Sequence, residues 1–157
     1  MISIRVYGIL INDEHQILVS DEYIRTMYVT KFCGGGLEEG EGTRECLRRE
    51  FMEEMNLKIE VQEHFYTTDF FQQSAFRNGD QIMSIYYKVK ALEPITAPLR
   101  SQPFQFDERE MAMYNATGET ETFRFINLQN FNEDCMTLPI DKIVANMILK
   151  SHNNFKI

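Results

Sequence analysis

Short stretches of the chain alternate apolar and polar residues with a period of two, which is typical of half-buried β-strands. The first begins at Ile2, and the later ones are rich in β-branched and aromatic residues. Turn-forming residues separate these stretches, and residues 77–80 predict a hairpin turn between the fourth and the fifth. The expected strands cover residues 2–10, 16–20, 28–33, 59–71, 81–92 and 121–128.

Two segments follow the helical period instead. Residues 43–55 open with Thr43, a residue type that favours helix N-caps, and carry Glu45 in the first turn, where its charge complements the helix dipole. The second segment starts at Pro139, a residue type suited to the first helical turn. Its apolar residues recur with the spacing of one buried helix face: Ile140, Ile143, Val144, Met147 and Ile148.

The order of these elements predicts the fold class. Strands lie on both sides of a central helix and a second helix comes last, which indicates an α/β fold with a mixed β-sheet between helices. Residues 94–118 form a long irregular stretch with one short helix near 107–113, and loops of that length are often functional. At 157 residues, with no linker or repeat, the chain is expected to form one domain, residues 1–157.

Composition indicates a globular protein and narrows its partners. Hydrophobic residues make up 43% and charged residues 25% of the chain, and no apolar run is long enough to span a membrane. A net charge of −8 argues against binding to a nucleic-acid polymer. We find no secretory signal, and the three cysteines lack metal-site spacing, which suggests reduced, buried thiols in a cytoplasmic protein: Cys33, Cys46 and Cys135.

The helix expected at residues 43–55 carries an acidic cluster. With 100° between successive residues, Glu50, Glu53 and Glu54 fall within an arc of about 100° on one helix face. Like charges this close repel one another, so the cluster needs either full solvation or a bound cation. Carboxylate oxygens suit a hard divalent ion, Mg²⁺ or Mn²⁺, whose other positions are left to water and substrate phosphates.

A solvated acidic face is the plainer explanation of such a run, and two neighbouring features weaken it. The apolar residues Leu47 and Phe51 lie directly beside the acidic arc, which places the carboxylates at the edge of the core. The glycine segment 34–36 precedes the helix and allows close backbone approach to a metal or a phosphate. On these residues alone, both interpretations stay open.

Residues 35–57 as a whole resemble the Nudix box, G-x5-E-x7-R-E-U-x-E-E-x-G-U, in which U is a bulky apolar residue. Asn56 replaces the usual glycine at the helix end, where a positive φ is expected and Asn is tolerated. Phe32 and Cys33 stand where a proline often precedes the glycines. Neither departure removes a ligand, and the positions in register are Gly35, Glu41, Arg49, Glu50, Phe51, Glu53, Glu54 and Leu57.

The resemblance implies a Nudix-type α/β/α sandwich and a hydrolase that cleaves the diphosphate linkage of a nucleoside diphosphate joined to another group. It implies Mg²⁺ or Mn²⁺ as the cofactor, with Arg49 as an orienting partner of Glu41 and Glu53 as the first candidate for the general base. The metal ligands that it implies are Glu50, Glu53, Glu54 and the backbone of Gly35.

Four residues outside the box are further candidates. The resemblance suggests a fourth metal-binding carboxylate ahead of the late strand, with Glu119 the first choice and Glu121 the second; Glu121 is also a candidate substrate contact. Phe70 and Phe71 are expected mainly as strand residues with core and cross-strand contacts, and a base-stacking platform for the substrate is the alternative.

A rival from another functional class is a Nudix-fold ligand-binding or regulatory module without turnover. Retention of the box glutamates argues against it, because a pure binding domain has no need for three mutually repelling charges. An isomerase of diphosphate lipid precursors is a third alternative, without a supporting histidine or cysteine constellation in the sequence. The expected partner is a small nucleotide-like substrate, and a homodimer is compatible with the sequence.

Overall fold

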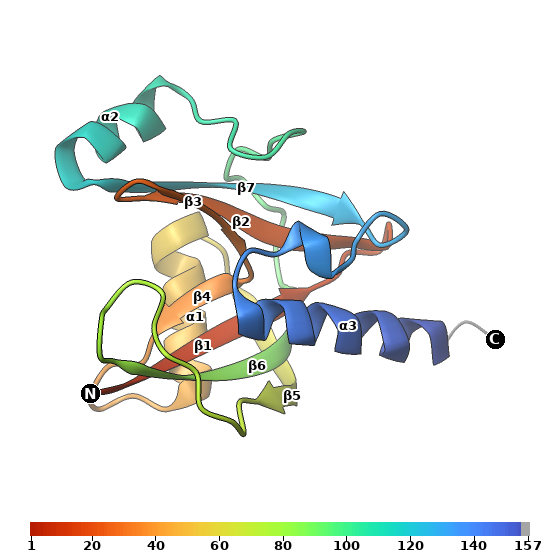
Figure 1. Cartoon of the computed structure of the whole chain (residues 1–157). Coiled ribbons are helices and arrows are strands. Elements are labelled where there is room, and N and C mark those ends of the chain that lie inside the picture. The colour runs from red at the N-terminus through yellow and green to blue at the C-terminus, as the bar shows by residue number, and fades with distance from the viewer. Residues whose placement is uncertain (155–157) are drawn as a thin grey trace. The chain divides into compact units, whose positions relative to one another are not determined.

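The computed structural model describes residues 1–154, which Figure 1 shows as a cartoon. The chain divides into two compact units, each built from two separate chain segments. The first unit contains Met1–Asn12 and Cys33–Ala97, and the second contains Asp13–Phe32 and the chain from Pro98 onward. The last residues of the expected domain, 155–157, lie outside the described residues. The expectation of one domain for the whole chain stays a prediction.

A mixed four-stranded sheet forms the first unit, as expected, in the order β4-β1-β6-β5. Strand β1 runs parallel to β6 and antiparallel to β4, and β5 pairs antiparallel with β6. Helix α1 packs against this sheet and begins and ends at the predicted residues. The elements are β1 (Ile2–Leu10), β4 (Cys33–Gly36), α1 (Thr43–Met55), β5 (Ile59–Thr67) and β6 (Gln81–Ala91).

The core of the first unit lies between α1 and the sheet. Leu47 and Phe51 are fully buried, which confirms the predicted apolar side of the helix beside the acidic arc. Gly8 of β1 leaves room for the Phe51 ring, because a Cβ at this position would come within 3.1 Å of that ring. Burying these large apolar side chains gives α1 a fixed rotation on the sheet, and therefore decides which way its carboxylates point.

The second unit contains an antiparallel sheet in the order β3-β2-β7, which the sequence did not separate from the first. Helix α2 packs near β7, and α3 packs near a short 3₁₀ turn, η1. The elements are β2 (Gln16–Ile24), β3 (Met27–Lys31), α2 (Glu108–Thr117), β7 (Glu119–Asn127), η1 (Glu133–Cys135) and α3 (Pro139–Asn154).

The predicted buried face of α3 is correct for three of its five residues. Ile140, Val144 and Ile148 are buried, whereas Ile143 is exposed and Met147 is half-buried. Asp141 and Ala145 are buried instead, because the buried side of the helix is rotated by roughly one residue from the one that apolar spacing indicates.

Several predicted boundaries are wrong because pairing partners distant in sequence decide them. Strand β2 continues to Ile24 through the polar residues at its end, since both β3 and β7 pair with it there. The stretch 28–33 divides at Phe32 into β3 and β4, which belong to different sheets. The short helix near 107–113 extends over Glu108–Thr117, with an Asp107 cap and Gly118 at its end.

The connection between β5 and β6 is a loop of residues 68–80 and not the tight hairpin that the turn residues suggest. One isolated antiparallel bridge joins Gln73 of this loop to Gln81 at the start of β6. Phe70 and Phe71 lie in this loop, so the expectation of a strand through residue 71 is wrong.

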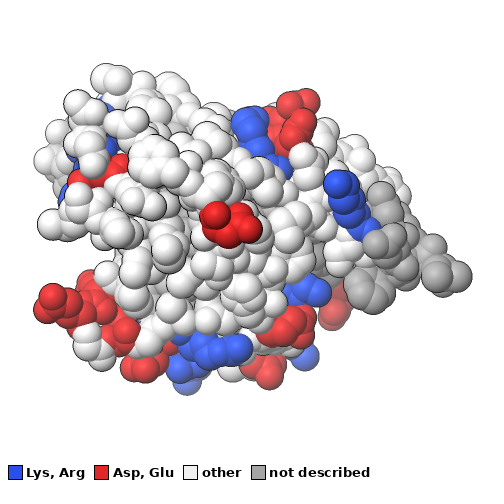
Figure 2. Space-filling view, turned by 60° about the horizontal axis from the view of Figure 1, so that its bottom comes forward, with Lys and Arg blue, Asp and Glu red and all other residues white. Residues whose placement is uncertain are grey.

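Two of the three cysteines are buried, as expected, and none of the three forms a disulfide within residues 1–154. Cys135 is partly exposed instead, because it ends the short η1 turn. On the face drawn in Figure 2, Lys and Arg atoms lie in separate small groups, several of them beside Asp and Glu. Among the described residues, no helix is long and apolar enough to cross a membrane.

Candidate active site

Helix α1 carries the site, and its two ends are fixed by local backbone geometry. The N-cap is Gly42 and not Thr43, and the Glu45 carboxylate accepts a hydrogen bond from the Gly42 backbone N–H. The Thr43 hydroxyl instead lies 2.7 Å from the hydroxyl of Tyr87 on β6. At the C-terminal end, Asn56 adopts the left-handed conformation (φ 51°, ψ 42°), which confirms the expected positive φ.

Strand β4 brings the backbone of Gly35 against the acidic side of α1. A Cβ at this position would lie 2.5 and 2.6 Å from the two carboxylate oxygens of Glu50, so only glycine leaves the space that this carboxylate occupies. The Glu50 side chain is 13% exposed. The expected close approach of backbone and carboxylate is therefore present.

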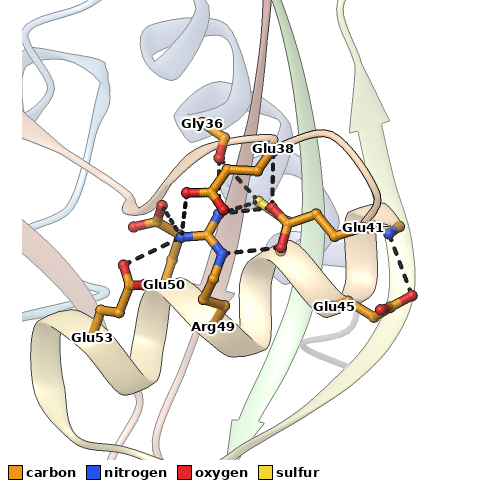
Figure 3. A network of polar contacts seen from close by, with 9 residues as sticks. Gly36, Glu38, Glu41, Glu45, Arg49, Glu50 and Glu53 are labelled. Carbon is orange, nitrogen blue, oxygen red and sulfur yellow. Dashed lines mark hydrogen bonds and ion pairs between the residues drawn. The ribbon is translucent and has the colours of Figure 1, made fainter.

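Arg49 is the centre of a polar network that joins the loop before α1 to the acidic arc (Figure 3). Its Nε and Nη2 donate to the two oxygens of Glu41 at 3.0 and 2.7 Å, and Nη2 also donates to the carbonyl of Gly36 at 3.0 Å. Its Nη1 donates to Glu50 at 3.0 Å and to Glu53 at 3.2 Å. One guanidinium thus holds three carboxylates of the box.

This network fixes the charge state of Glu41. Hydrogen bonds from Arg49, and then from the Glu38 backbone N–H, lower the pKa of Glu41 to about 2. The Glu41 carboxylate is therefore ionised at all ordinary pH values and is a permanent anchor for the guanidinium. Burial, and next the charge of Glu41, raise the pKa of the neighbouring Cys46 thiol to about 12, so this cysteine is no nucleophile.

The donor set fits a hard divalent ion. Glu50, Glu53 and Glu54 offer only carboxylate oxygens, from one helix face beside a backbone with no side chain in the way. As their side chains stand, no three carboxylate, imidazole or thiol groups in residues 1–154 converge as a metal-binding group. Glu50 and Glu53 are instead drawn to Arg49, whose charge replaces part of what a metal would supply.

The two acidic candidates outside the box belong to the second unit, on the same side of β7. Glu121 is half-buried and accepts a 2.8 Å hydrogen bond from the Ser20 hydroxyl of β2. Glu119 is exposed at the first residue of the strand. Glu121 is therefore the more firmly held of the two.

Sequence reasoning missed a group of polar residues around Glu121. Glu22 lies directly opposite it in the β2–β7 ladder, and the Nζ of the buried Lys31 lies 3.6 Å from the Glu22 carboxylate. Two carboxylates facing each other across strands are unfavourable without such a cation. The signal was present in the sequence, where the polar residues 20–22 interrupt an otherwise apolar strand.

The aromatic pair Phe70 and Phe71 lies in the β5–β6 loop, with Phe71 71% exposed. Core packing, the main expectation for these rings, is therefore wrong, because the chain leaves the sheet after Thr67. Exposed rings on a loop are available to a planar ligand, so the base-stacking alternative stays a prediction.

Comparison with known proteins decides the family, because the NUDIX domain family matches residues 1–147. The chain belongs to the Nudix family. This confirms the resemblance of the box and the expected enzyme class, a hydrolase acting on diphosphate bonds. Nudix hydrolases generally use divalent metal ions. No match was found among curated proteins.

Solved structures share this Nudix fold at low sequence identity. The ORF135 protein of E. coli is 15% identical, with a TM-score of 0.68, and the match covers 99% of this chain and 94% of that one. A MutT protein from Methanosarcina mazei is 13% identical, with a TM-score of 0.64, over 97% and 95% of the two chains. An ADP-ribose pyrophosphatase from Streptococcus suis is 15% identical, with a TM-score of 0.57, over 94% and 87%.

Proposed function

We propose that this Nudix hydrolase cleaves the diphosphate linkage of a nucleoside diphosphate joined to another group, with Mg²⁺ or Mn²⁺ held by α1. The observation that carries the proposal is the close approach of the Glu50 carboxylate to the backbone of Gly35, where no side chain intervenes. A side chain at residue 35 would fill the space that a metal ligand needs, and glycine keeps it open. The proposed metal ligands are Glu50, Glu53, Glu54 and the backbone of Gly35, and Glu119 and Glu121 stay sequence-based candidates for a further carboxylate.

Bound divalent ions would neutralise charge on the phosphoryl oxygens and activate the attacking water. Glu53 is our candidate for the general base, because its side chain is 60% exposed and open to water. Arg49 is a positioning residue that orients Glu53 and Glu50 by hydrogen bonds, and Glu41 fixes Arg49 in turn. Phe70 and Phe71 are candidates for stacking on a base, since both rings are accessible.

The substrate class is tested by a hydrolysis screen with Mg²⁺ and with Mn²⁺. The panel should contain nucleoside triphosphates, nucleotide sugars, ADP-ribose and dinucleotides. Two proteins of the same fold are named UDP-X diphosphatase and ADP-ribose pyrophosphatase, which supports including the second and third of these classes. We expect release of a nucleoside monophosphate from at least one diphosphate-linked compound, only when a divalent ion is added. A protein that binds such compounds, and hydrolyses none with either metal, would instead be a silent ligand-binding module.

We predict that Glu121→Gln lowers kcat by about tenfold or more with little change in KM, because a fourth ligand acts mainly on the transition state. Glu119→Gln is expected to have a smaller effect, since this side chain is exposed and Glu121 is held by Ser20. The kcat and KM of both single variants and of the double variant are measured by steady-state kinetics. Full activity of the double variant would show that no carboxylate of β7 takes part.

A further inference from the structure

The guanidinium of Arg49 has no spare donor. It carries five N–H groups, and six hydrogen bonds use them: five go to oxygens of Glu41, Gly36, Glu50 and Glu53, and one of 3.7 Å goes from Nη2 to the sulfur of Cys46. Two edges of the group have different partners. The Nε–Nη2 edge meets Glu41, which is not a proposed metal ligand, whereas Nη1 meets two residues that are (Figure 3).

The two edges also differ in how firmly they are held. Glu41 is mostly buried and bound through both of its oxygens, the strongest arrangement open to an arginine and a carboxylate. Glu53 is largely exposed and accepts one bond, and exposed pairs of this kind contribute little free energy. Glu50 is as buried as Glu41, at 13% exposed, but it accepts only one bond from Arg49. Nη1 therefore holds each of its carboxylates by a single bond and can release them while the rest of the guanidinium stays in place.

The Arg49 guanidinium and a bound divalent ion would compete for the same negative charge. Arg49 contributes one positive charge to a group in which it contacts the carboxylates of Glu41, Glu50 and Glu53, with Glu38 at 3.7 Å. Nη1 binds one oxygen of Glu50 and one of Glu53, so a divalent ion held by these carboxylates would share them with the guanidinium. Each carboxylate oxygen that turns to the ion leaves the guanidinium, and the two positive charges repel each other at short range.

We propose that Arg49 is a built-in competitor of the catalytic metal, a resident cation that holds Glu50 and Glu53 together and is partly displaced from them when the ion enters. The inference rests on the metal site of the proposed function. Arg49 therefore has two opposite effects: it stabilises the fold without the ion, and it weakens the binding of the ion.

The test titrates Arg49→Met and Arg48→Met with magnesium at constant ionic strength. Calorimetry measures the magnesium Kd of each variant, and the melting temperature measures its stability with and without magnesium. Methionine keeps an unbranched apolar stem and removes the charge and the donors. Arg48 is the matched control, because it is exposed on the side of α1 that faces away from the acidic arc. Both variants lose one positive charge from the same helix.

We expect Arg49→Met to melt at a lower temperature than the wild type in EDTA, and to bind Mg²⁺ about tenfold more tightly. Arg48→Met is expected to change the magnesium Kd by no more than about twofold, since it removes only a distant, screened charge. Equal or weaker magnesium binding by Arg49→Met, relative to Arg48→Met, would overturn the competition and leave Arg49 as an organiser of ligands. Failure of the wild-type protein to bind magnesium would overturn the metal site itself.

Should Arg49→Met not fold, Arg49→Lys decides the question. Lysine keeps the charge, but its single ammonium cannot span Glu41 and the Glu50–Glu53 pair as a planar guanidinium does. Competition predicts magnesium binding tighter than that of the wild type, by a smaller factor than for the neutral variant. A magnesium Kd equal to or above the wild-type value would overturn the proposal.

Discussion

Glu53→Gln and Glu54→Gln are each expected to lower kcat by about three orders of magnitude, the largest change that we predict for any single substitution. Glutamine is nearly isosteric with glutamate, so α1 and its packing should persist. What is lost is the negative charge that a divalent ion needs from its ligands. The measurement is steady-state hydrolysis of the substrate that the screen identifies, at saturating Mg²⁺.

Glu45→Gln is the matched control for these two variants. It makes the same chemical change in the same helix, at a residue that caps the first turn, and the amide oxygen can still accept from the Gly42 N–H. We expect its kcat within about twofold of the wild type. Wild-type turnover in either Glu53→Gln or Glu54→Gln would remove that residue from the metal ligands.

Gly34→Ala is expected to destabilise the protein by about 3 kcal/mol or more, a large part of the stability of an ordinary domain. Gly34 has a φ of 152° and pairs with Tyr7 of β1, and a Cβ there would collide with the backbone carbonyl oxygen of Val6. Backbone atoms of a paired strand cannot move aside as a side-chain end can. Urea unfolding of the variant measures the effect.

The two following glycines make a graded control series. A Cβ at Gly36 would meet only the end of the Arg5 side chain, at 3.6 Å, so Gly36→Ala should unfold near the wild-type urea concentration. Gly35→Ala should fold but lose magnesium binding, because its methyl group displaces only the Glu50 carboxylate. Comparable stability losses at all three positions would mean that general strand effects, and not the Val6 contact, explain Gly34.

Local signals predicted the parts of the structure that depend on neighbours in sequence. Helix α1 has the expected boundaries, because its apolar face and the left-handed Asn56 are encoded within 14 residues. The acidic arc likewise follows from helical spacing alone. The network of Arg49 was only half predicted: its contact with Glu41 was expected from the resemblance, whereas its bonds to Glu50 and Glu53 depend on side-chain conformations that spacing does not determine.

Long-range pairing explains what the sequence did not reveal. The glycine segment looks like a loop, yet it forms strand β4, because β1 offers it a partner about 28 residues away. Turn chemistry at residues 77–80 indicated a hairpin, and the aromatic run ahead of it hid the point where β5 ends. The polar end of β2 forms a strand because β7 pairs with it from the other half of the chain.

The alternation of chain segments between the two units has a consequence for biosynthesis. Strand β2 pairs with β7 in a register that joins Glu22 to Glu121, so its partner leaves the ribosome about 100 residues later, or roughly 5–20 s at usual translation rates. During that interval β2 has only β3 beside it and exposes an edge able to pair with other chains. Neither unit is a continuous piece of the gene, so neither can be released by a single cut. Folding of the second unit waits for the segment of the chain that begins at Pro98.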